Sequence, residues 1–233
     1  NDISLKVYPG EVLGVAGVVG AGRTELVSTV FGRDKSLGGK VYLDGKEITG
    51  FSTAKILEAG INYVPEDRHY HGLFCISTIA ANTTSALLAK PEMGNFILNT
   101  KNEYSITQRF IDLFRIKVTD QKQTASSLSG GNQQKVVISR ALSTEPKMVI
   151  MDEPTRGIDA VARGDVYNII HQLREKGVAV LLVSSDIEEI VQLSDRVVTV
   201  FQGRINGEFS KDEITVDNLT IASFGLTKDE AMV

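Results

Sequence analysis

The sequence predicts an α/β protein with a mixed core sheet, and three features support that prediction. Apolar runs suited to buried strands recur between stretches with helical spacing, at residues 11–16, 147–151 and 178–183. The first run leads into the glycine-rich residues 17–24, and the second ends at two adjacent acids. Because α/β folds place ligand groups at the carboxyl ends of their strands, the same features indicate where a binding site lies.

Composition indicates one large domain, or one domain with a lobe, since 233 residues with 42% hydrophobic content can bury a full core. The net charge is -4 and the basic residues lie scattered without interleaved aromatics, which argues against nucleic acid as a principal ligand. No apolar run approaches the roughly 20 residues that span a bilayer, and no signal peptide precedes the first strand, so we expect a chain that is soluble by itself. The lone Cys75 is interpreted as a small, partly buried hydrophobe in a reducing compartment.

The first third of the chain predicts an antiparallel β lobe. Residues 3–8 alternate apolar and polar as a half-buried strand does, and Pro9-Gly10 ends that strand with a turn. Residues 41–45 end in Asp-Gly, which predicts a hairpin beside the first strands. Residues 61–64 are apolar enough to form a further strand.

The glycine-rich residues 17–24 lie between a predicted strand and a predicted helix. This is the setting that a P-loop requires, because successive loop N–H groups must point at phosphate oxygens. Arg23 stands where the motif has lysine, whereas Thr24 still offers the hydroxyl expected to ligate Mg²⁺. Arginine keeps the positive charge, but its longer planar fork cannot occupy the same point. A solvated basic residue is the alternative; the dipole at a helix start disfavours it, so we predict a phosphate partner for Arg23.

Two later stretches complete the pattern of motifs. Residues 76–123 have helical spacing of apolar residues and few strand signals, which predicts a helical lobe. Ser129-Gly130-Gly131 then precedes an apolar helix, so unobstructed N–H groups meet the positive end of a helix dipole and form an anion site. An ordinary serine cap with flexible glycines is the alternative, which the accompanying motifs argue against.

Taken in order and spacing, these motifs resemble the nucleotide-binding cassette of ABC transporters over about residues 3–209. Residues 128–135 match its signature motif, residues 148–153 its Walker B strand, residues 157–159 its D-loop and residues 17–24 its Walker A loop. The resemblance implies an ABC-type transporter ATPase that uses ATP and Mg²⁺. The fold it implies is a P-loop NTPase core with an N-terminal antiparallel β lobe and an inserted helical lobe.

The resemblance also implies roles for individual residues. Nucleotide contacts are expected from Gly17, Val19, Gly20, Ala21, Gly22, Arg23, Thr24, Glu66, Ser129, Gly130, Gly131 and Asp159. Mg²⁺ is expected at Thr24, Asp152 and Glu66. Glu153 is the expected general base that polarises the attacking water, and Ser185 the expected catalytic contact to the γ-phosphate.

Some of these positions leave alternatives open. Glu66 stands at the family's glutamine, where a carboxylate can meet Mg²⁺ or its water, although an exposed acid in a charged loop fits equally. Ser185 stands at the family's histidine, and a serine can donate a hydrogen bond but cannot carry charge. Asp152 and Glu153 follow an apolar strand, which favours function over a solvated N-cap for the helix of residues 161–176, while Asp159 is expected to take some such capping role. His69 and His71 have no ligand partners at metal spacing.

Arg23, Glu66 and Ser185 are departures on the half-site that grips phosphate, whereas residues 129–131 and the two acids are intact. In ABC proteins each ATP lies between the Walker motifs of one cassette and the signature of another. We therefore expect a degenerate Walker site whose signature completes the site of a partner. A non-hydrolysing regulatory module is the alternative; a soluble ABC protein of repair or translation is disfavoured because the chain lacks a coiled-coil insertion and basic patches.

Asn132, residues 65–68 and residues 154–159 resemble the C-terminal cassette of tandem-cassette monosaccharide and autoinducer-2 importers. This resemblance implies import of a ribose, galactose or autoinducer-2 type solute. The implied partners are a second cassette fused N-terminally, transmembrane permease subunits and, indirectly, a periplasmic or extracellular solute-binding protein. The implied location is peripheral, at the cytoplasmic face of the inner membrane. Residues 77–99 are expected at the permease contact, with a long loop and fraying helices as the alternative.

The expected organisation is one cassette over residues 1–233. The catalytic core with its β lobe takes about residues 1–75 and 128–209, and the helical lobe about residues 76–127. Residues 197–209 are expected to close the sheet as a hairpin, and residues 210–233 to form a polar helical tail.

Overall fold

The structure, a computed structural model, describes residues 3–94 and 97–226. Its backbone divides into two compact units. The first, here the sheet unit, comprises Asn1–Tyr63, Lys147–Glu153 and Ile170–Val233. The second, here the helical unit, comprises Val64–Pro146 and Pro154–Ile169.

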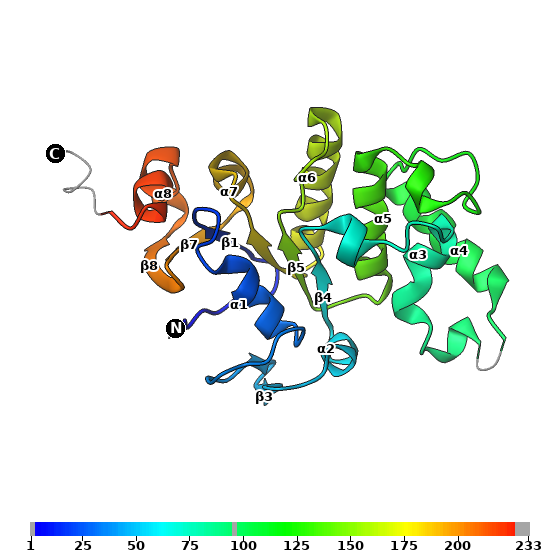
Figure 1. Cartoon of the computed structure of the whole chain (residues 1–233), viewed down its shortest axis with the longest axis horizontal. Coiled ribbons are helices and arrows are strands. Elements are labelled where there is room, and N and C mark those ends of the chain that lie inside the picture. The colour runs from blue at the N-terminus through cyan, green and yellow to red at the C-terminus, as the bar shows by residue number, and fades with distance from the viewer. Residues whose placement is uncertain (1–2, 95–96, 227–233) are drawn as a thin grey trace. The chain divides into compact units, whose positions relative to one another are not determined.

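A six-stranded sheet in the order β4-β5-β6-β1-β7-β8 dominates the sheet unit (Figure 1). The strands are β1 (Val12–Ala16), β4 (Ile61–Val64), β5 (Met148–Asp152), β6 (Ala179–Val183), β7 (Arg196–Phe201) and β8 (Arg204–Phe209). β1 pairs in parallel with both β6 and β7, and β5 with β6, while β8 returns antiparallel to β7. The predicted mixed sheet and its closing hairpin are therefore confirmed.

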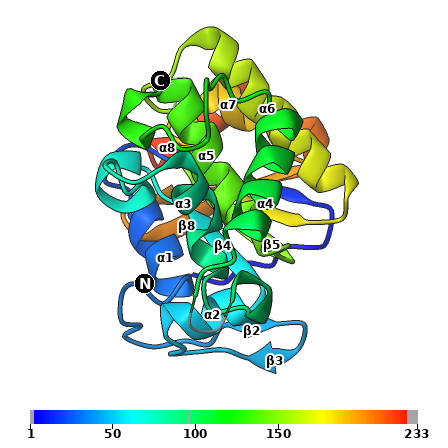
Figure 2. The same cartoon turned by 90° about the vertical axis from the view of Figure 1, so that its right-hand side faces the viewer.

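The helical unit contains α3 (Ile79–Thr84), α4 (Thr100–Leu113) and α5 (Gly130–Ser143), and α3 packs against both of the others (Figure 2). Short turns join them: η1 (Arg68–Gly72), η2 (Ser85–Leu87), η3 (Pro91–Met93) and η4 (Ala125–Ser127). The helical character predicted for residues 76–123 is confirmed in the described part of that range. Helix α6 (Ala160–Glu175) begins in this unit and ends in the sheet unit.

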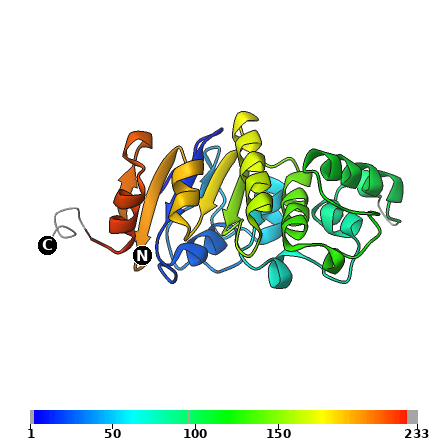
Figure 3. The ribbon, with the colours of Figure 1, turned by 90° about the horizontal axis from the view of Figure 1, so that it is seen from above.

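Alternate residues of β1 face opposite sides of the sheet. A Cβ atom at Gly14 would lie 2.4 Å from Ser194 Oγ and 3.0 Å from Ile190, at the end of α7 (Ile187–Leu193). Leu13 and Val15 point the other way, into a cluster with Val27 of α1 (Arg23–Val30). Helices α1 and α7 therefore cover opposite faces (Figure 3).

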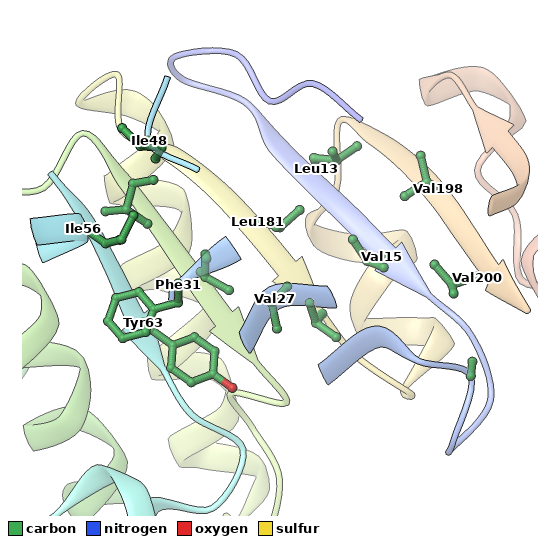
Figure 4. Close-up of a cluster of buried hydrophobic side chains, with 14 residues drawn as sticks. Leu13, Val15, Val27, Phe31, Ile48, Ile56, Tyr63, Leu181, Val198 and Val200 are labelled. Carbon is green, nitrogen blue, oxygen red and sulfur yellow. The ribbon is translucent and has the colours of Figure 1, made fainter. Parts of the chain in front are cut away.

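The core cluster between α1 and the sheet anchors the glycine loop that precedes α1 (Figure 4). Its sheet residues include Leu13, Val15, Leu181, Val198 and Val200, and its helix residues include Val27 and Phe31. All of these side chains are at most 9% exposed, so the loop lies on a rigid, well-buried base.

The N-terminal β lobe is smaller than predicted. The hairpin forms, with β2 (Tyr42–Leu43) antiparallel to β3 (Lys46–Glu47), and α2 (Thr53–Ala59) follows it. The predicted strand at residues 3–8 is wrong, because these residues form no strand in the described chain. Ile3, Leu5 and Val7 do pack on the core cluster, so their alternation reports burial of side chains and not pairing of the backbone.

The C-terminal part of the described chain is helical. η5 (Lys211–Glu213) and α8 (Val216–Ser223) confirm helical structure at the start of the predicted tail, whose residues 227–233 lie outside the described residues. Within residues 3–94 and 97–226, none of the helices is both long enough and apolar enough to cross a membrane.

Candidate functional site

The glycine loop connects β1 to α1, as predicted, and two of its glycines are required by the backbone. A Cβ at Gly17 would lie 2.4 Å from the carbonyl oxygen of Val200, and Gly22 adopts a left-handed φ of 100° at the start of α1. Ala21 is buried; its N–H donates to the Val18 carbonyl at 3.0 Å, and its carbonyl accepts from the Gly203 N–H at 2.8 Å. Val19 and Gly20 are exposed at the tip of the loop.

Arg23, the first residue of α1, is buried rather than solvated. Its side chain is 7% exposed, and its Nη2 lies 3.2 Å from Glu153 Oε1. Nη1 is buried too and has no hydrogen-bond partner among the described residues. A buried, unpartnered N–H of a charged group is costly, so a bound phosphate oxygen would satisfy it. The alternative of a solvated arginine is therefore wrong, and the donor that a phosphate needs is present.

Glu153 follows β5 directly and is held from several sides within the sheet unit. Its Oε1 accepts from the Ser185 N–H at 2.8 Å and pairs with Arg23, and its Oε2 accepts from Ser185 Oγ at 3.2 Å. Its backbone has a positive φ of 48°, and its N–H donates to the Val183 carbonyl at 2.8 Å. Both carboxylate oxygens, which a general base would use to take a proton, thus already accept hydrogen bonds from Ser185.

Asp152, the last residue of β5, is fully buried. Its Oδ1 accepts from Thr24 Oγ1 at 3.4 Å, and its Oδ2 accepts from Tyr63 OH at 2.8 Å. Burial raises the pKa of Asp152, and these two hydrogen bonds oppose that rise. Burial also raises the pKa of the Tyr63 hydroxyl, which stays protonated and donates.

The oxygens of Thr24 and Asp152 are hard donors of the kind that Mg²⁺ prefers. In the described ranges no group of three or more His, Cys, Asp or Glu side chains could hold a metal ion. A Mg²⁺ ion at these two residues would accordingly take further oxygens from water or from phosphate, which is its usual habit. Thr24 and Asp152 therefore fit the predicted Mg²⁺ ion. Glu66, the third predicted ligand, belongs to the helical unit.

Tyr63 was missed by the sequence reasoning. It lies in β4, all four residues of which are buried, and its ring packs on Phe31 with the centroids 5.2 Å apart. The available signal was a tyrosine in a strand apolar enough to be buried, since a buried hydroxyl must find a partner. The identity of that partner, Asp152, depends on tertiary structure.

The remaining predicted residues lie in the helical unit. The carboxylate of Glu66 forms an ion pair with Arg156, so it is a paired acid, and its predicted contact with Mg²⁺ stays a prediction. Asp159 Oδ1 accepts from the Ala162 N–H at 2.9 Å, which caps α6 and lowers the pKa of Asp159. The capping role predicted for Asp159 is confirmed.

The signature residues open α5, as predicted. Ser129 is exposed at the N-cap, and its Oγ accepts from Asn132 Nδ2 at 2.9 Å. A Cβ at Gly131 would lie 2.3 Å from Ala162 Cβ, and one at Gly130 would lie 2.8 Å from Arg68 Nη2. Gly131 is therefore required by its packing on Ala162 inside the helical unit, and Gly130 leaves the space that the Arg68 guanidinium occupies. The sequence did not reveal either reason.

Several known proteins are similar to this chain. The sequence profile of the family described as "ABC transporter" matches residues 1–156. The chain is 40% identical over 223 residues to "Ribose import ATP-binding protein RbsA" of Caldanaerobacter subterraneus, covering 96% of this chain and 45% of that protein. It is 42% identical over 226 residues to "Xylose import ATP-binding protein XylG" of Moorella thermoacetica, covering 97% and 44%. For "Autoinducer 2 import ATP-binding protein LsrA" of Enterobacter sp. the identity is 40% over 224 residues, covering 96% and 44%. The chain spans less than half the length of these relatives.

Solved structures confirm the predicted fold. An ATP-binding cassette of an ABC transporter superposes with a TM-score of 0.80 at 23% identity, covering 97% of this chain and 91% of that chain. A dimeric cassette in a post-hydrolysis state, bound to ADP and Pi, superposes with a TM-score of 0.78 at 21% identity, covering 90% and 89%. At these identities the likeness concerns the fold alone.

Proposed function

The chain belongs to the ABC transporter family, whose ATP-binding proteins are ATPases, and from that membership we propose that it powers import of a sugar or sugar-like solute together with a second cassette. ATP with Mg²⁺ is the proposed fuel. The names of its relatives, which refer to ribose, xylose and autoinducer 2, support this class of solute. Of the predicted ribose, galactose or autoinducer-2 type solutes, ribose and autoinducer 2 are named among these relatives, and galactose stays a prediction.

The single observation that carries the proposal in detail is the engagement of Glu153. Arg23 and Ser185, two of the departures from the family pattern, both bind its carboxylate. An ion pair and two hydrogen bonds thus compete with water for lone pairs on both carboxylate oxygens of Glu153. The Walker site of this chain is therefore proposed to bind nucleotide and to turn it over slowly.

The helical unit supports the other half of the proposal. Ser129 is exposed at the start of a 14-residue helix, so its neighbouring N–H groups can receive an anion from outside this chain. We propose that this signature completes a competent site on a partner cassette, fused N-terminally in the full protein.

Contacts with a membrane partner are proposed for the same unit. Tyr70, Phe74 and Ile76 are exposed large hydrophobics within seven residues of sequence, and Leu88 and Ile97 follow. Exposed apolar side chains gathered in one segment are typical of a protein interface. They support the proposal that permease subunits dock here, at the cytoplasmic face of the inner membrane, with a solute-binding protein acting from the opposite side.

The test compares two substitutions in the assembled transporter that contains this chain. Ser129→Arg places a bulky cation in the signature turn and is expected to abolish ATP hydrolysis and solute uptake. Glu153→Gln removes a base that serves only the slow site, so uptake should fall by about threefold or less. Unchanged melting temperatures would exclude misfolding. If Glu153→Gln proves as damaging as Ser129→Arg, the site of this chain turns over in the transport cycle and the asymmetric proposal fails.

A further inference from the structure

Arg68 opens the π-helical turn η1, two residues beyond Glu66. The turn is fixed at its start by Asp67, whose Oδ1 accepts from the N–H groups of His69 at 2.9 Å and Tyr70 at 3.0 Å. The Arg68 side chain is thus directed from a well-defined backbone.

The Arg68 guanidinium joins two segments that are remote in sequence. Its Nε donates to Gln133 Oε1 at 3.2 Å, in the first turns of α5. Its Nη1 donates to the Arg156 carbonyl at 3.0 Å, and its Nη2 to the Gly157 carbonyl at 3.2 Å. Every nitrogen of the planar fork is therefore used, an arrangement that a point-charge ammonium cannot reproduce.

Two neighbours make this geometry specific. His69 Nε2 lies 2.9 Å from the same Gln133 Oε1, while Gln133 Nε2 donates to the Ala125 carbonyl at 3.2 Å. A Cβ at Gly130 would lie 2.8 Å from Arg68 Nη2 and 3.2 Å from the Gly157 carbonyl. The guanidinium consequently lies directly against the backbone at the first residue of α5, and the absent side chain of Gly130 makes room for it.

We propose that Arg68 is a positioning residue that holds residues 129–131 and residues 156–159 in one fixed arrangement. The inference rests on the proposed function, in which a partner cassette uses the signature of this chain. Arg68 touches no reacting atom in this proposal. It acts by keeping the signature turn and the turn before α6 in the geometry that the partner's nucleotide meets, and positional errors of about 1 Å are costly in catalysis.

The first test is Arg68→Lys in the assembled transporter, with Arg109→Lys as the matched control. Arg109 belongs to the same unit, is 55% exposed and lies 3.7 Å from Glu145, so Arg109→Lys makes the same chemical change at a side chain that does not join two remote segments. Arg68→Lys is expected to lower kcat for ATP hydrolysis about tenfold, with nucleotide affinity of the Walker site within twofold. Arg109→Lys should leave both unchanged.

The second readout is amide hydrogen exchange of the same proteins. Arg68→Lys should speed exchange at residues 129–133 and 156–162 while the strands of the sheet unit keep their protection. Gln133→Met removes the oxygen that accepts from Arg68 Nε, so it should reproduce that local pattern. Faster exchange throughout the chain would assign Arg68 a general structural role and overturn the proposal.

The outcomes separate this inference from the proposed function. If Ser129→Arg abolishes hydrolysis but Arg68→Lys leaves kcat within twofold and exchange unchanged, the positioning role is refuted and the proposed function stands. If Ser129→Arg leaves hydrolysis intact, the proposed function fails, and with it the inference drawn from it.

Discussion

The functional loops of the two units differ in what they bind within the chain. In the sheet unit Arg23 forms an ion pair with Glu153, and Ser185 donates hydrogen bonds to the same carboxylate. In the helical unit the signature serine is exposed, and its glycines are held by packing against Ala162 and Arg68. The charged residues of the sheet unit thus bind one another, whereas the serine that precedes α5 is exposed.

This difference explains why departures from a family pattern need to be considered together. Taken singly, Arg23 replaces the lysine of the family pattern and Ser185 replaces its histidine. Taken together, both bind the carboxylate of Glu153, a shared contact that neither departure reveals by itself.

The largest effect is expected from the metal. Asp152→Asn replaces a buried carboxylate by a neutral amide of the same shape, and removal of Mg²⁺ from the unchanged chain should have the same result. Nucleotide affinity measured by calorimetry should fall at least tenfold, about 1.4 kcal/mol, in either case. Glu153→Gln is the control and should bind nearly normally. Binding by Asp152→Asn that still depends on Mg²⁺ would remove Asp152 from the proposed metal site.

A smaller effect is expected from Arg23→Lys. A lysine keeps the charge but cannot both reach Glu153 and fork towards phosphate, so the base is released. Steady-state phosphate release by the purified chain should rise about threefold to tenfold, still below the range of about 1–100 s⁻¹ typical of phosphoryl-transfer enzymes such as kinases. Arg174→Lys, at an ion pair of 3.2 Å with Asp195 in the same unit, is the control. An unchanged or lower rate would show that Arg23 does not restrain the base.

The smallest effect concerns the pH dependence of stability. Asp159 of the helical unit and Asp152 of the sheet unit should change the free energy of unfolding in opposite directions as the pH rises. The folded pKa of Asp159 lies below its usual 3.8 because backbone N–H groups donate to it, so its contribution to stability is lost as the pH falls through that lowered value. The folded pKa of Asp152 is raised mainly by burial, so its contribution is lost as the pH rises above 3.8 through the raised value.

Melting temperatures measured without nucleotide or metal, from about pH 2.5 to pH 7, check both signs. Asp159→Asn can still cap α6 but does not titrate, so it should flatten the acid limb of the curve. Asp152→Asn should remove the fall in melting temperature that Asp152 causes at pH values above the acid limb. If the curves of melting temperature against pH for both variants run parallel to that of the unchanged chain, the pKa directions given for Asp159 and Asp152 are wrong.

Periodicity predicted most of the fold because burial and secondary structure leave local traces in a sequence. β1, β4, β5, β6 and the two hairpins occur where apolar runs and turn residues predict them. The strand predicted at residues 3–8 is wrong because alternation of apolar and polar residues indicates which side chains are buried. It does not indicate whether another strand pairs with the backbone.

The site was predictable in its parts and not in its connections. Motif spacing located Thr24, Asp152 and Glu153, but the pairing of Arg23 with Glu153 joins residues 130 positions apart and exists only in the folded chain. The same limit applies to Tyr63 and to Arg68, whose partners lie on segments that are distant in sequence. Sequence therefore identified the chemical groups, and the structure supplied the contacts that restrain them.

Residues 3–8 are held in the sheet unit without a strand ladder. They are attached by alternate side chains on the core cluster and by Arg196, whose Nη2 donates to the Lys6 carbonyl at 2.5 Å. Nε of Arg196 also binds Glu11 Oε1 at 2.9 Å, next to β1. An attachment of this kind can break without disturbing a strand ladder, so its free energy of opening is lower than that of the six-stranded sheet. The backbone amides of residues 3–8 are therefore expected to exchange hydrogen faster than those of β1, which lie inside the ladder.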